Sequence, residues 1–249
     1  MELIHPLDFV NDQLFANSLQ LKDSIVPFYH FQKKRIKILG SSVYLTFNDR
    51  YFLATASHVI EGRPVIFSDP ELTISLPNVF VGFPDPIDVS VAELSGPLEK
   101  YQPLHVKQMR NFAKLPTGGR FFASGFPGSK THEDRKVIDS TLITIFSGGE
   151  KKVEFERLNV AQQWAFGFHY PKKGLKDFDG KPTNQVNAHG MSGGGVFWIS
   201  DRGHRETVPS FLVGILVRWD DKISNTLVGM GIVKIVELLS GLVGTSIEF

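Results

Sequence analysis

Short apolar runs separated by glycine, proline, asparagine and aspartate dominate the chain from Ile36 onward. The runs are rich in β-branched and aromatic residues and recur at short intervals, which is typical of β-strands. The strands predicted in this way are SVYLTF, YFLATA, PVIFS, LTISL, VSVAEL, RFFASGF, KVIDSTLITIF, KVEFERL, GGVFWI and FLVGILVRW. The pattern therefore predicts a chain built from many short strands.

Turn and helix signals refine this picture. The stretch TFNDRYFL places Asn-Asp between two apolar runs, which predicts a β-hairpin. The stretch IVKIVELLSGLVG, from Ile232 to Gly244, has apolar residues three and four apart and ends on glycine, which predicts a C-terminal helix. Many strands and few helices indicate an all-β protein, either a sandwich or a pair of barrels.

The composition narrows the class of protein. With 249 residues, 42% hydrophobic and 21% charged, the chain is ordinary for a soluble globular protein with a sizeable core. A net charge of +1 gives no global field that favours nucleic acid or an anionic membrane. The absence of cysteine excludes disulfides, thiolate metal sites and a cysteine nucleophile.

The sequence carries no signal for export or membrane insertion. The first residues, MELIHPLDFVNDQLF, include acidic side chains and no continuous apolar run, unlike a secretory signal. No apolar run approaches the roughly 20 residues that span a bilayer. We therefore expect a cytoplasmic protein without a membrane or nucleic-acid partner.

Three segments carry candidate chemistry. YFLATASHVIEG places His58 after an apolar strand, DPIDVSVAEL places Asp88 at the head of a strand, and NAHGMSGGGVFW places Ser192 among four glycines. A serine hydroxyl is a weak nucleophile, so a neutral imidazole must take its proton, and a carboxylate on the other ring nitrogen fixes the tautomer. Asp85 is a rival carboxylate, but Asp88 is preferred because the alternating strand begins directly after it.

In this order the segments resemble the trypsin-like serine proteases, in particular the cysteine-free, bacterial, HtrA-like branch. FLATASHV is similar to the family's apolar residues before T-A-A-H, DVSVAEL to its aspartate before alternating apolar residues, and GMSGG to its G-x-S-G-G. ASGFPG, FLVGILV and GMGIVKI are weaker matches in the right order. A PDZ domain, which HtrA proteases carry, is not expected, because too few residues follow the protease region.

The resemblance implies a chymotrypsin-like fold of two perpendicular six-stranded antiparallel β-barrels with a short C-terminal helix. Residues 1–35 would form an N-terminal segment. Residues 36–115 would form the first barrel, and residues 116–249 the second barrel and the helix. The catalytic site would lie in the cleft between the barrels.

The resemblance also implies roles for individual residues. His58 would be the general base, Asp88 its orienting carboxylate and Ser192 the nucleophile of a serine endopeptidase that needs no cofactor or metal. The backbone N–H groups of Gly190 and Ser192 would form the oxyanion hole. A protein or peptide would be the substrate.

Three positions depart from the family pattern. Met191 stands where secreted digestive proteases carry the aspartate that pairs with a freed N-terminus, so activation by N-terminal cleavage is not expected. Regulation would instead come from a protein partner that orders the active-site loops. Gly195 replaces a frequent proline and is expected to loosen the beginning of its strand, whereas Ser57 is a small change from alanine.

The substrate pocket is carried over from the same resemblance. Val186 would form its base, and Val217 to Trp219 its wall. A valine base offers no carboxylate for arginine or lysine, and Trp219 would narrow the pocket. We therefore expect a preference for small or medium apolar side chains.

The residues around Ser192 also fit other interpretations. GMSGG also fits the G-x-S-x-G turn of α/β-hydrolases, which need an acid and then a histidine after the serine. Only Asp201 and His204 follow in that order, three residues apart, so this interpretation is rejected. The other histidines lack paired metal spacing, and His189 is expected at the surface. A protease-like module that binds peptides without turnover stays open as the alternative.

Overall fold

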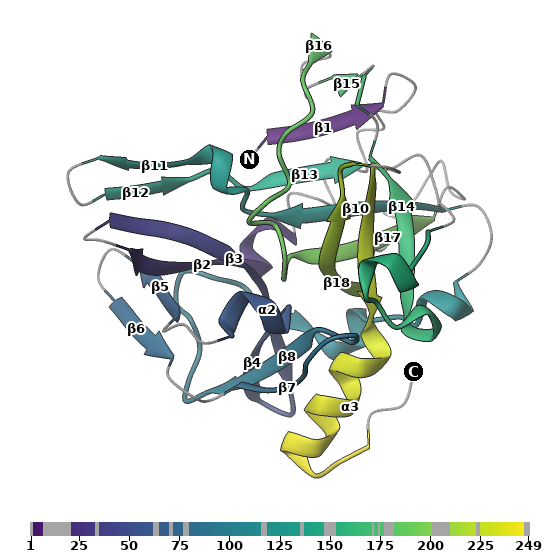
Figure 1. Cartoon of the computed structure of the whole chain (residues 1–249). Coiled ribbons are helices and arrows are strands. Elements are labelled where there is room, and N and C mark those ends of the chain that lie inside the picture. The colour runs from purple at the N-terminus through teal and green to yellow at the C-terminus, as the bar shows by residue number, and fades with distance from the viewer. Residues whose placement is uncertain are drawn as a thin grey trace, which may run out of the picture.

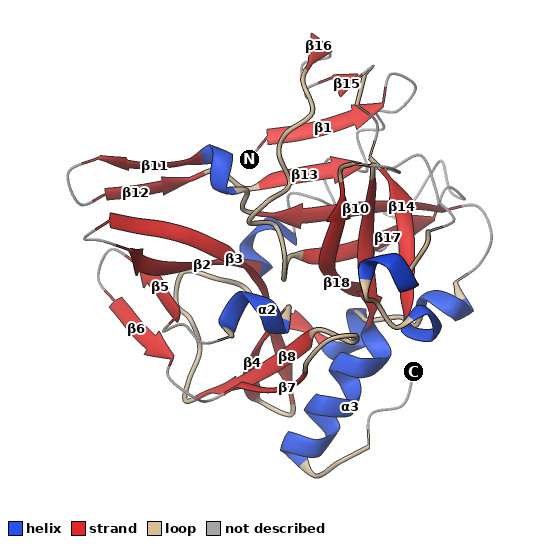
Figure 2. Ribbon diagram, viewed as in Figure 1, coloured by secondary structure: helices blue, strands red, loops and turns tan. Residues whose placement is uncertain are grey.

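The computed structural model describes residues 2–6, 21–32, 35–61, 65–69, 72–76, 80–115, 119–134, 137–146, 153–170, 172–173, 175–176, 182–200, 210–222 and 225–246. Strands dominate these residues, and one long helix lies near the C-terminus (Figure 2). The predicted all-β class with a C-terminal helix is therefore confirmed.

The first sheet contains eight described strands, in the order β6-β5-β2-β3-β4-β8-β7 with β9 paired to β3. Their bounds are β2 (Ile25–Gln32), β3 (Arg35–Phe47), β4 (Arg50–Thr55), β5 (Val65–Asp69), β6 (Leu72–Leu76), β7 (Phe80–Phe83), β8 (Val89–Leu94) and β9 (Leu104–His105). The predicted hairpin joins β3 to β4, where Asn48 and Asp49 have φ values of 50° and 58°. Positive φ at both turn residues gives a twist that matches the flanking strands.

The second sheet contains nine described strands, in the order β14-β19-β18-β17-β10-β13-β1-β15-β16. The bounds are β1 (Glu2–Pro6), β10 (Gly119–Gly125), β13 (Ile143–Phe146), β14 (Ala165–His169), β15 (Leu175–Lys176), β16 (Pro182–Thr183), β17 (Gly195–Ser200), β18 (Ser210–Asp220) and β19 (Thr226–Gly231). The strands from β14 to β13 form its antiparallel centre, and β1, β15 and β16 extend one side. A separate hairpin is formed by β11 (Thr131–Asp134) and β12 (Val137–Ser140).

Helices are short except at the C-terminal end. The helix α2 is a single turn, Ser57–Ile60, and α3 spans Ile232–Val243 and ends at Gly244, which has a φ of 71°. Glycine adopts this left-handed conformation without strain, so it ends the helix where the sequence predicts. Six 3-10 turns are described: Lys22–Ser24, Val106–Gln108, Phe112–Lys114, Gly128–Lys130, Glu156–Leu158 and Gln162–Trp164. None of the helices in the described parts of the chain is long and apolar enough to cross a membrane.

One hydrophobic core joins the two sheets. Phe28 and Phe52 of the first sheet, Phe122 and Phe197 of the second, and Ile235 of α3 all belong to one buried cluster. The helix packs against β8 of the first sheet and against β18 and β19 of the second (Figure 1). A second cluster lies within the second sheet and includes aromatic side chains such as Phe121, Phe166 and Trp198. The shared core fixes how the two sheets face each other.

The N-terminal part of the chain differs from the expected organisation. β2 belongs to the first sheet, upstream of the expected boundary at residue 36, and β1 pairs in parallel with β13 of the second sheet. The strand predicted at residues 152–158 is wrong where the structure describes it, because Glu156–Leu158 form a 3-10 turn. The hydrogen bond from Arg157 Nη2 to buried Asp220 Oδ2, 2.5 Å long, anchors that turn to the end of β18.

Candidate active site

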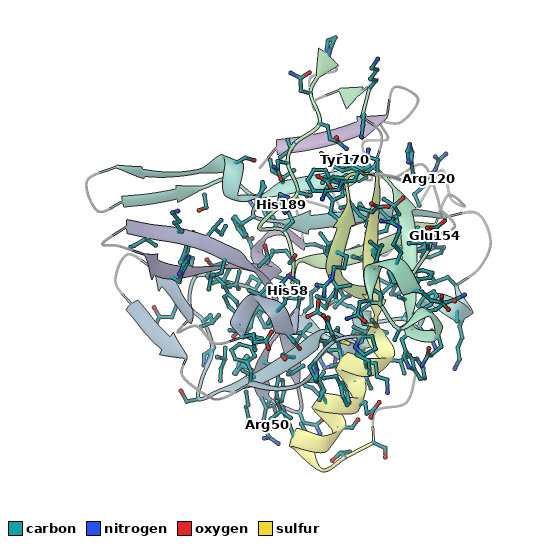
Figure 3. All side chains as sticks on the ribbon, in the orientation of Figure 1. Arg50, His58, Arg120, Glu154, Tyr170 and His189 are labelled. Carbon is teal, nitrogen blue, oxygen red and sulfur yellow. The ribbon has the colours of Figure 1, made fainter. Side chains whose placement is uncertain are left out.

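His58 and Asp88 meet through two hydrogen bonds. His58 lies in α2, one turn of helix directly after β4, and its Nδ1 is 2.7 Å from Asp88 Oδ2. The backbone N–H of His58 donates to the other carboxylate oxygen, Asp88 Oδ1, at 2.9 Å. The side chain of Asp88 is only 3% exposed, so the carboxylate is buried against the histidine that it orients. Figure 3 labels His58 near the middle of the molecule, where the two sheets approach each other.

The backbone before β8 aims the Asp88 carboxylate. Asp88 has a φ of 56°, a left-handed conformation that aspartate and asparagine adopt more readily than most residues. Its N–H donates to the Pro84 carbonyl at 3.1 Å, and its own carbonyl accepts from Ser57 N–H at 3.3 Å. The Ser57 hydroxyl donates to the Phe83 carbonyl at 2.8 Å and lies 2.7 Å from the Ser90 hydroxyl. Ser57 therefore ties the histidine turn to β7 and β8.

Arg218 of β18 contacts the same pair and was not recognised in the sequence. Its Nη1 donates to Asp88 Oδ2 at 2.6 Å and to the Val217 carbonyl at 3.1 Å, and it lies 2.9 Å from His58 Nδ1. Its Nη2 donates to Asp85 Oδ1 at 2.6 Å. Of the two rival aspartates, Asp88 contacts His58 and Asp85 contacts the arginine.

The hydrogen-bond partners of Arg218 and Asp88 determine which ring nitrogen of His58 carries the proton. Arg218 Nη1 carries two hydrogens, and Asp88 Oδ2 and the Val217 carbonyl accept them. A separation of 2.7 Å between His58 Nδ1 and a carboxylate oxygen requires a proton between them. Nδ1 therefore carries the hydrogen in neutral His58, and Nε2 keeps the lone pair that a general base needs.

The loop that carries Ser192 is held by its backbone between the two sheets. The Ser192 carbonyl accepts from Ser41 N–H of β3 at 2.7 Å, and Gly193 N–H donates to the Leu216 carbonyl of β18 at 2.7 Å. Gly193 has a φ of 85°, and a Cβ there would overlap the Ser41 carbonyl oxygen. Only glycine fits this close approach.

The peptide between His189 and Gly190 is oriented by one hydrogen bond. The His189 carbonyl accepts from Gly128 N–H at 2.8 Å. A trans peptide is planar, with its C=O and N–H pointing in opposite directions, so the Gly190 N–H faces away from Gly128. Neither this N–H nor that of Ser192 has an acceptor among the described residues. Both expected oxyanion donors are thus available to an added oxygen.

Burial of an apolar side chain, Met191, anchors the loop that carries Ser192. Met191 is fully buried in the second cluster, and its N–H donates to the Ala188 carbonyl at 3.0 Å. Gly195 lies within β17 and pairs with Ser124 on one side and Ile215 on the other. The expectation that Gly195 loosens the beginning of this strand stays a prediction. Gly195 is closely packed. Its backbone is paired on both sides, and the Phe197 ring would lie 2.6 Å from a Cβ at this position.

Gly40 of β3 lies close to the residue after His58 and to the backbone of Ser192. A Cβ at Gly40 would lie 2.7 Å from the Val59 side chain and 2.8 Å from the Ser192 carbonyl oxygen. The residue after His58 and the backbone of Ser192 therefore lie on two sides of one glycine. Within the described residues, no hydrogen bond joins the Ser192 hydroxyl to His58 Nε2.

The expected pocket residues separate into two groups. Val186 and Trp219 belong to the second cluster, whereas the Val217 side chain is buried in the core that joins the sheets. Tyr170 fixes Val186, because its hydroxyl donates to the Val186 carbonyl at 3.0 Å and accepts from its N–H at 2.8 Å. Burial raises the pKa of Tyr170 above its usual value, so this hydroxyl stays protonated.

Trp219 lies close to both Tyr170 and His189. Its ring centroid is 6.3 Å from that of Tyr170 and 5.4 Å from that of His189, the latter in an edge-on arrangement. His189, expected at the surface, is exposed but also contacts this tryptophan. The buried Trp219 Nε1 has no acceptor among the residues that the structure describes.

Comparisons with known proteins address the fold. No protein-family model matches the chain, and no curated protein sequence matches it significantly. The solved structure of the HtrA-type protease AlgW with a tripeptide aligns with a TM-score of 0.57 at 16% identity, covering 92% of this chain. The chain has a chymotrypsin-like fold. The fold class that the sequence resemblance implies is confirmed.

A second solved structure shares the chymotrypsin-like fold. The scabies mite inactivated protease paralogue aligns with a TM-score of 0.54 at 14% identity, covering 91% of this chain and 96% of its own. The present chain covers 63% of AlgW, less than two thirds of its length. AlgW has also been solved with a decapeptide, at a TM-score of 0.56 and 14% identity.

Proposed function

We propose that this protein is a serine endopeptidase that cleaves peptide bonds through a covalent acyl-enzyme. The observation that carries the proposal is the Asp88–His58 pair, in which the carboxylate binds both the ring Nδ1 and the backbone N–H of the histidine. This arrangement leaves Nε2 as the basic atom on the side of the imidazole away from Asp88. The chymotrypsin-like fold of solved proteases supports the same conclusion.

The proposed reaction assigns a step to each of these residues. The Ser192 hydroxyl attacks the peptide carbonyl while His58 Nε2 takes its proton, and Asp88 stabilises the imidazolium that forms. The negative charge develops on the carbonyl oxygen, where the N–H groups of Gly190 and Ser192 would bind it. One such donor is worth roughly 3 kcal/mol in the transition state.

His58 transfers one proton in each half of the reaction, first from Ser192 to the leaving amine and then from water to Ser192. The imidazolium of His58 gives its proton to the leaving amine, which departs as the C–N bond breaks and leaves an ester on Ser192. A water molecule then attacks this ester as His58 takes a proton from it. Return of the proton to Ser192 releases the acid product and restores the resting protein.

A fluorophosphonate probe tests the proposal. We expect the wild-type protein to form one covalent adduct, read by intact mass, and the Ser192→Ala variant to form none. A folded wild-type protein that stays unlabelled, with and without candidate protein activators, would overturn the proposed activity. Labelling without cleavage of any tested peptide would indicate a narrow substrate range or a latent state.

The pocket residues support a preference for small or medium apolar side chains next to the cleaved bond. Val186 offers no charge to a basic side chain, and Trp219 fills space close to Tyr170 and His189. A panel of peptides that differ only at this position measures the preference. Fastest cleavage after arginine or lysine would contradict it.

A peptide-binding module without turnover is the second candidate. It is favoured by the absence, among the described residues, of a hydrogen bond between Ser192 and His58. The scabies mite paralogue, whose name calls it inactivated, has the same fold. Peptide binding with equal affinity by wild-type protein and Ser192→Ala, together with no probe labelling, would support this function.

Location in the cytoplasm and a regulatory partner stay predictions.

A further inference from the structure

Arg218 joins two carboxylates at the candidate site. Its Nη1 binds buried Asp88, and its Nη2 binds Asp85, which is 45% exposed. The two hydrogen bonds are equally short, at 2.6 Å. The arginine side chain is itself 24% exposed, so the network runs from solvent at Asp85 to the buried carboxylate beside His58.

A lone guanidinium at this place would oppose catalysis. His58 must become an imidazolium during the reaction, and Arg218 Nη1 lies only 2.9 Å from its Nδ1. Like charges this close disfavour one another. Arg218 also neutralises Asp88, the carboxylate that would otherwise balance the imidazolium.

Asp85 supplies the missing negative charge. With Asp85 present, two carboxylates face one guanidinium and one imidazolium, and the charges balance when His58 is protonated. We propose that Asp85 and Arg218 are positioning residues for the reaction, with Asp85 offsetting the guanidinium so that Asp88 remains an effective partner of His58. This inference rests on the proposed protease function, because the imidazolium of His58 that Asp85 would help to stabilise forms in that reaction.

The same chain offers a matched control network away from this site. Arg157 binds exposed Glu154 through Nε at 3.3 Å and buried Asp220 through Nη2 at 2.5 Å. This arrangement also joins an exposed carboxylate to a buried aspartate through an arginine. Glu154 lies apart from His58 (Figure 3). Glu154→Gln therefore controls for the general effect of removing an exposed carboxylate from such a network.

The decisive variants remove charge while keeping shape. Asp85→Asn can still present an oxygen to Arg218 Nη2, but it leaves the guanidinium uncompensated. Asp85→Asn/Arg218→Gln removes both charges. The measured quantities are the first-order labelling constant of Ser192 at saturating fluorophosphonate and the concentration of probe that gives half of it.

We expect Asp85→Asn to slow the saturated labelling step by about tenfold, with the half-saturating concentration unchanged. Arg218→Gln alone should slow it by only about threefold, because both hydrogen bonds from His58 to Asp88 remain. The double variant should match Arg218→Gln within about twofold, because the charge that Asp85 offsets is then absent. Glu154→Gln should behave as wild type.

Two kinetic results would overturn the inference. Asp85→Asn labelling within twofold of wild type would do so, as would a double variant slowed by the product of the two single effects. An equal loss in Glu154→Gln would show that the effect is general. Unfolding midpoints of all variants should agree, which separates positioning from loss of structure.

Proton NMR makes the inference testable even without labelling. The His58 Nδ1–H shared with Asp88 Oδ2 should resonate far downfield of the amide protons in wild-type protein. The resonance should move upfield in Asp85→Asn and return in the double variant. An unchanged resonance in Asp85→Asn would overturn the inference. Failure of wild-type protein to label would instead overturn the proposed protease function and leave this resonance to decide the role of Asp85.

Discussion

His58 and Asp88 are held by side-chain hydrogen bonds and charge, whereas the loop of Ser192 is held by backbone contacts and by the burial of Met191. Both oxygens of the Asp88 carboxylate bind His58, two serine hydroxyls tie the histidine turn to its neighbouring strands, and Arg218 of the second sheet binds Asp88. In the loop of Ser192, glycine turns let the backbone reach Ser41 and Leu216.

The first region therefore determines the proton transfer, whereas the second determines whether the protein folds. A polar side chain of the first region can be replaced by one of the same shape, and the fold should survive while the proton transfer fails. A single added methyl group in the second region has no space to occupy, so the structure itself should fail.

Asp88→Asn should give the largest loss of activity. Asparagine keeps the shape and tolerates the φ of 56°, but its amide NH₂ would favour the wrong tautomer of His58. The same change in a Ser-His-Asp triad of another protein lowers turnover by about 10⁴-fold, and we expect a similar loss in the labelling rate of Ser192. An unfolding midpoint close to wild type should accompany it. A labelling rate within tenfold of wild type would break the comparison.

Gly193→Ala should give the largest loss of stability. Its φ of 85° and the overlap of a Cβ with the Ser41 carbonyl should cost about 4 kcal/mol in the free energy of unfolding. Gly241→Ala is the matched control, because Gly241 lies in α3 with open space around it. Alanine there should stabilise the protein by about 0.5–1 kcal/mol. Chemical denaturation measures both, and similar values would contradict the account of the loop.

Met191→Ala tests the apolar support of the oxyanion loop. The side chain is fully buried, so its truncation should leave a cavity and cost about 3 kcal/mol of stability. Met191→Leu nearly conserves the volume and should cost less than about 1.5 kcal/mol. Labelling should fall with Met191→Ala, because the loop carries Ser192. Equal stability of the two variants would show that packing here does not hold the loop.

Tyr170→Phe should have the smallest effect and a characteristic pH dependence. Loss of the hydroxyl leaves the N–H and carbonyl of Val186 without their partner, at a cost of about 2 kcal/mol. Burial raises the pKa of Tyr170, so above about pH 10 the unfolded chain loses this proton while the folded chain keeps it. Wild-type stability should therefore fall above this pH, and its advantage over Tyr170→Phe should shrink. An advantage that grows with pH would contradict the burial of this hydroxyl.

Local patterns predicted most of the fold. Apolar runs predicted strands such as β4, β8, β17 and β18 but not β2, β7 or β14, and KVEFERL was wrongly predicted as a strand. Asn48 and Asp49 predicted the hairpin, and the spacing before Gly244 predicted the helix. These features depend on neighbouring residues, which the sequence displays directly. The order of His58, Asp88 and Ser192 was also visible, because each lies at the end of a recognisable strand or in a glycine-rich turn.

The sequence did not predict which face of the sheet each side chain of β18 occupies. Its register shifts between Leu216 and Arg218, a bulge that interrupts the alternation of side chains. As a result Trp219 packs in the same cluster as Leu216, although the two are three positions apart and strict alternation would place them on opposite faces, and Val217 lies in the other core. Arg218 is thereby brought to Asp85 and Asp88, which are distant in sequence, and no local pattern indicates that contact.

The dependence of Ser192 acylation on His58 tests the central claim most directly. Fluorophosphonate is added to wild-type protein and to His58→Ala, and the adduct is located by mass spectrometry of peptides. We expect a single adduct on Ser192 in the wild type and a rate at least about 10³-fold lower in His58→Ala, since the hydroxyl then lacks its base. No adduct in wild-type protein, an adduct on another residue, or equal rates in the two proteins would contradict the claim.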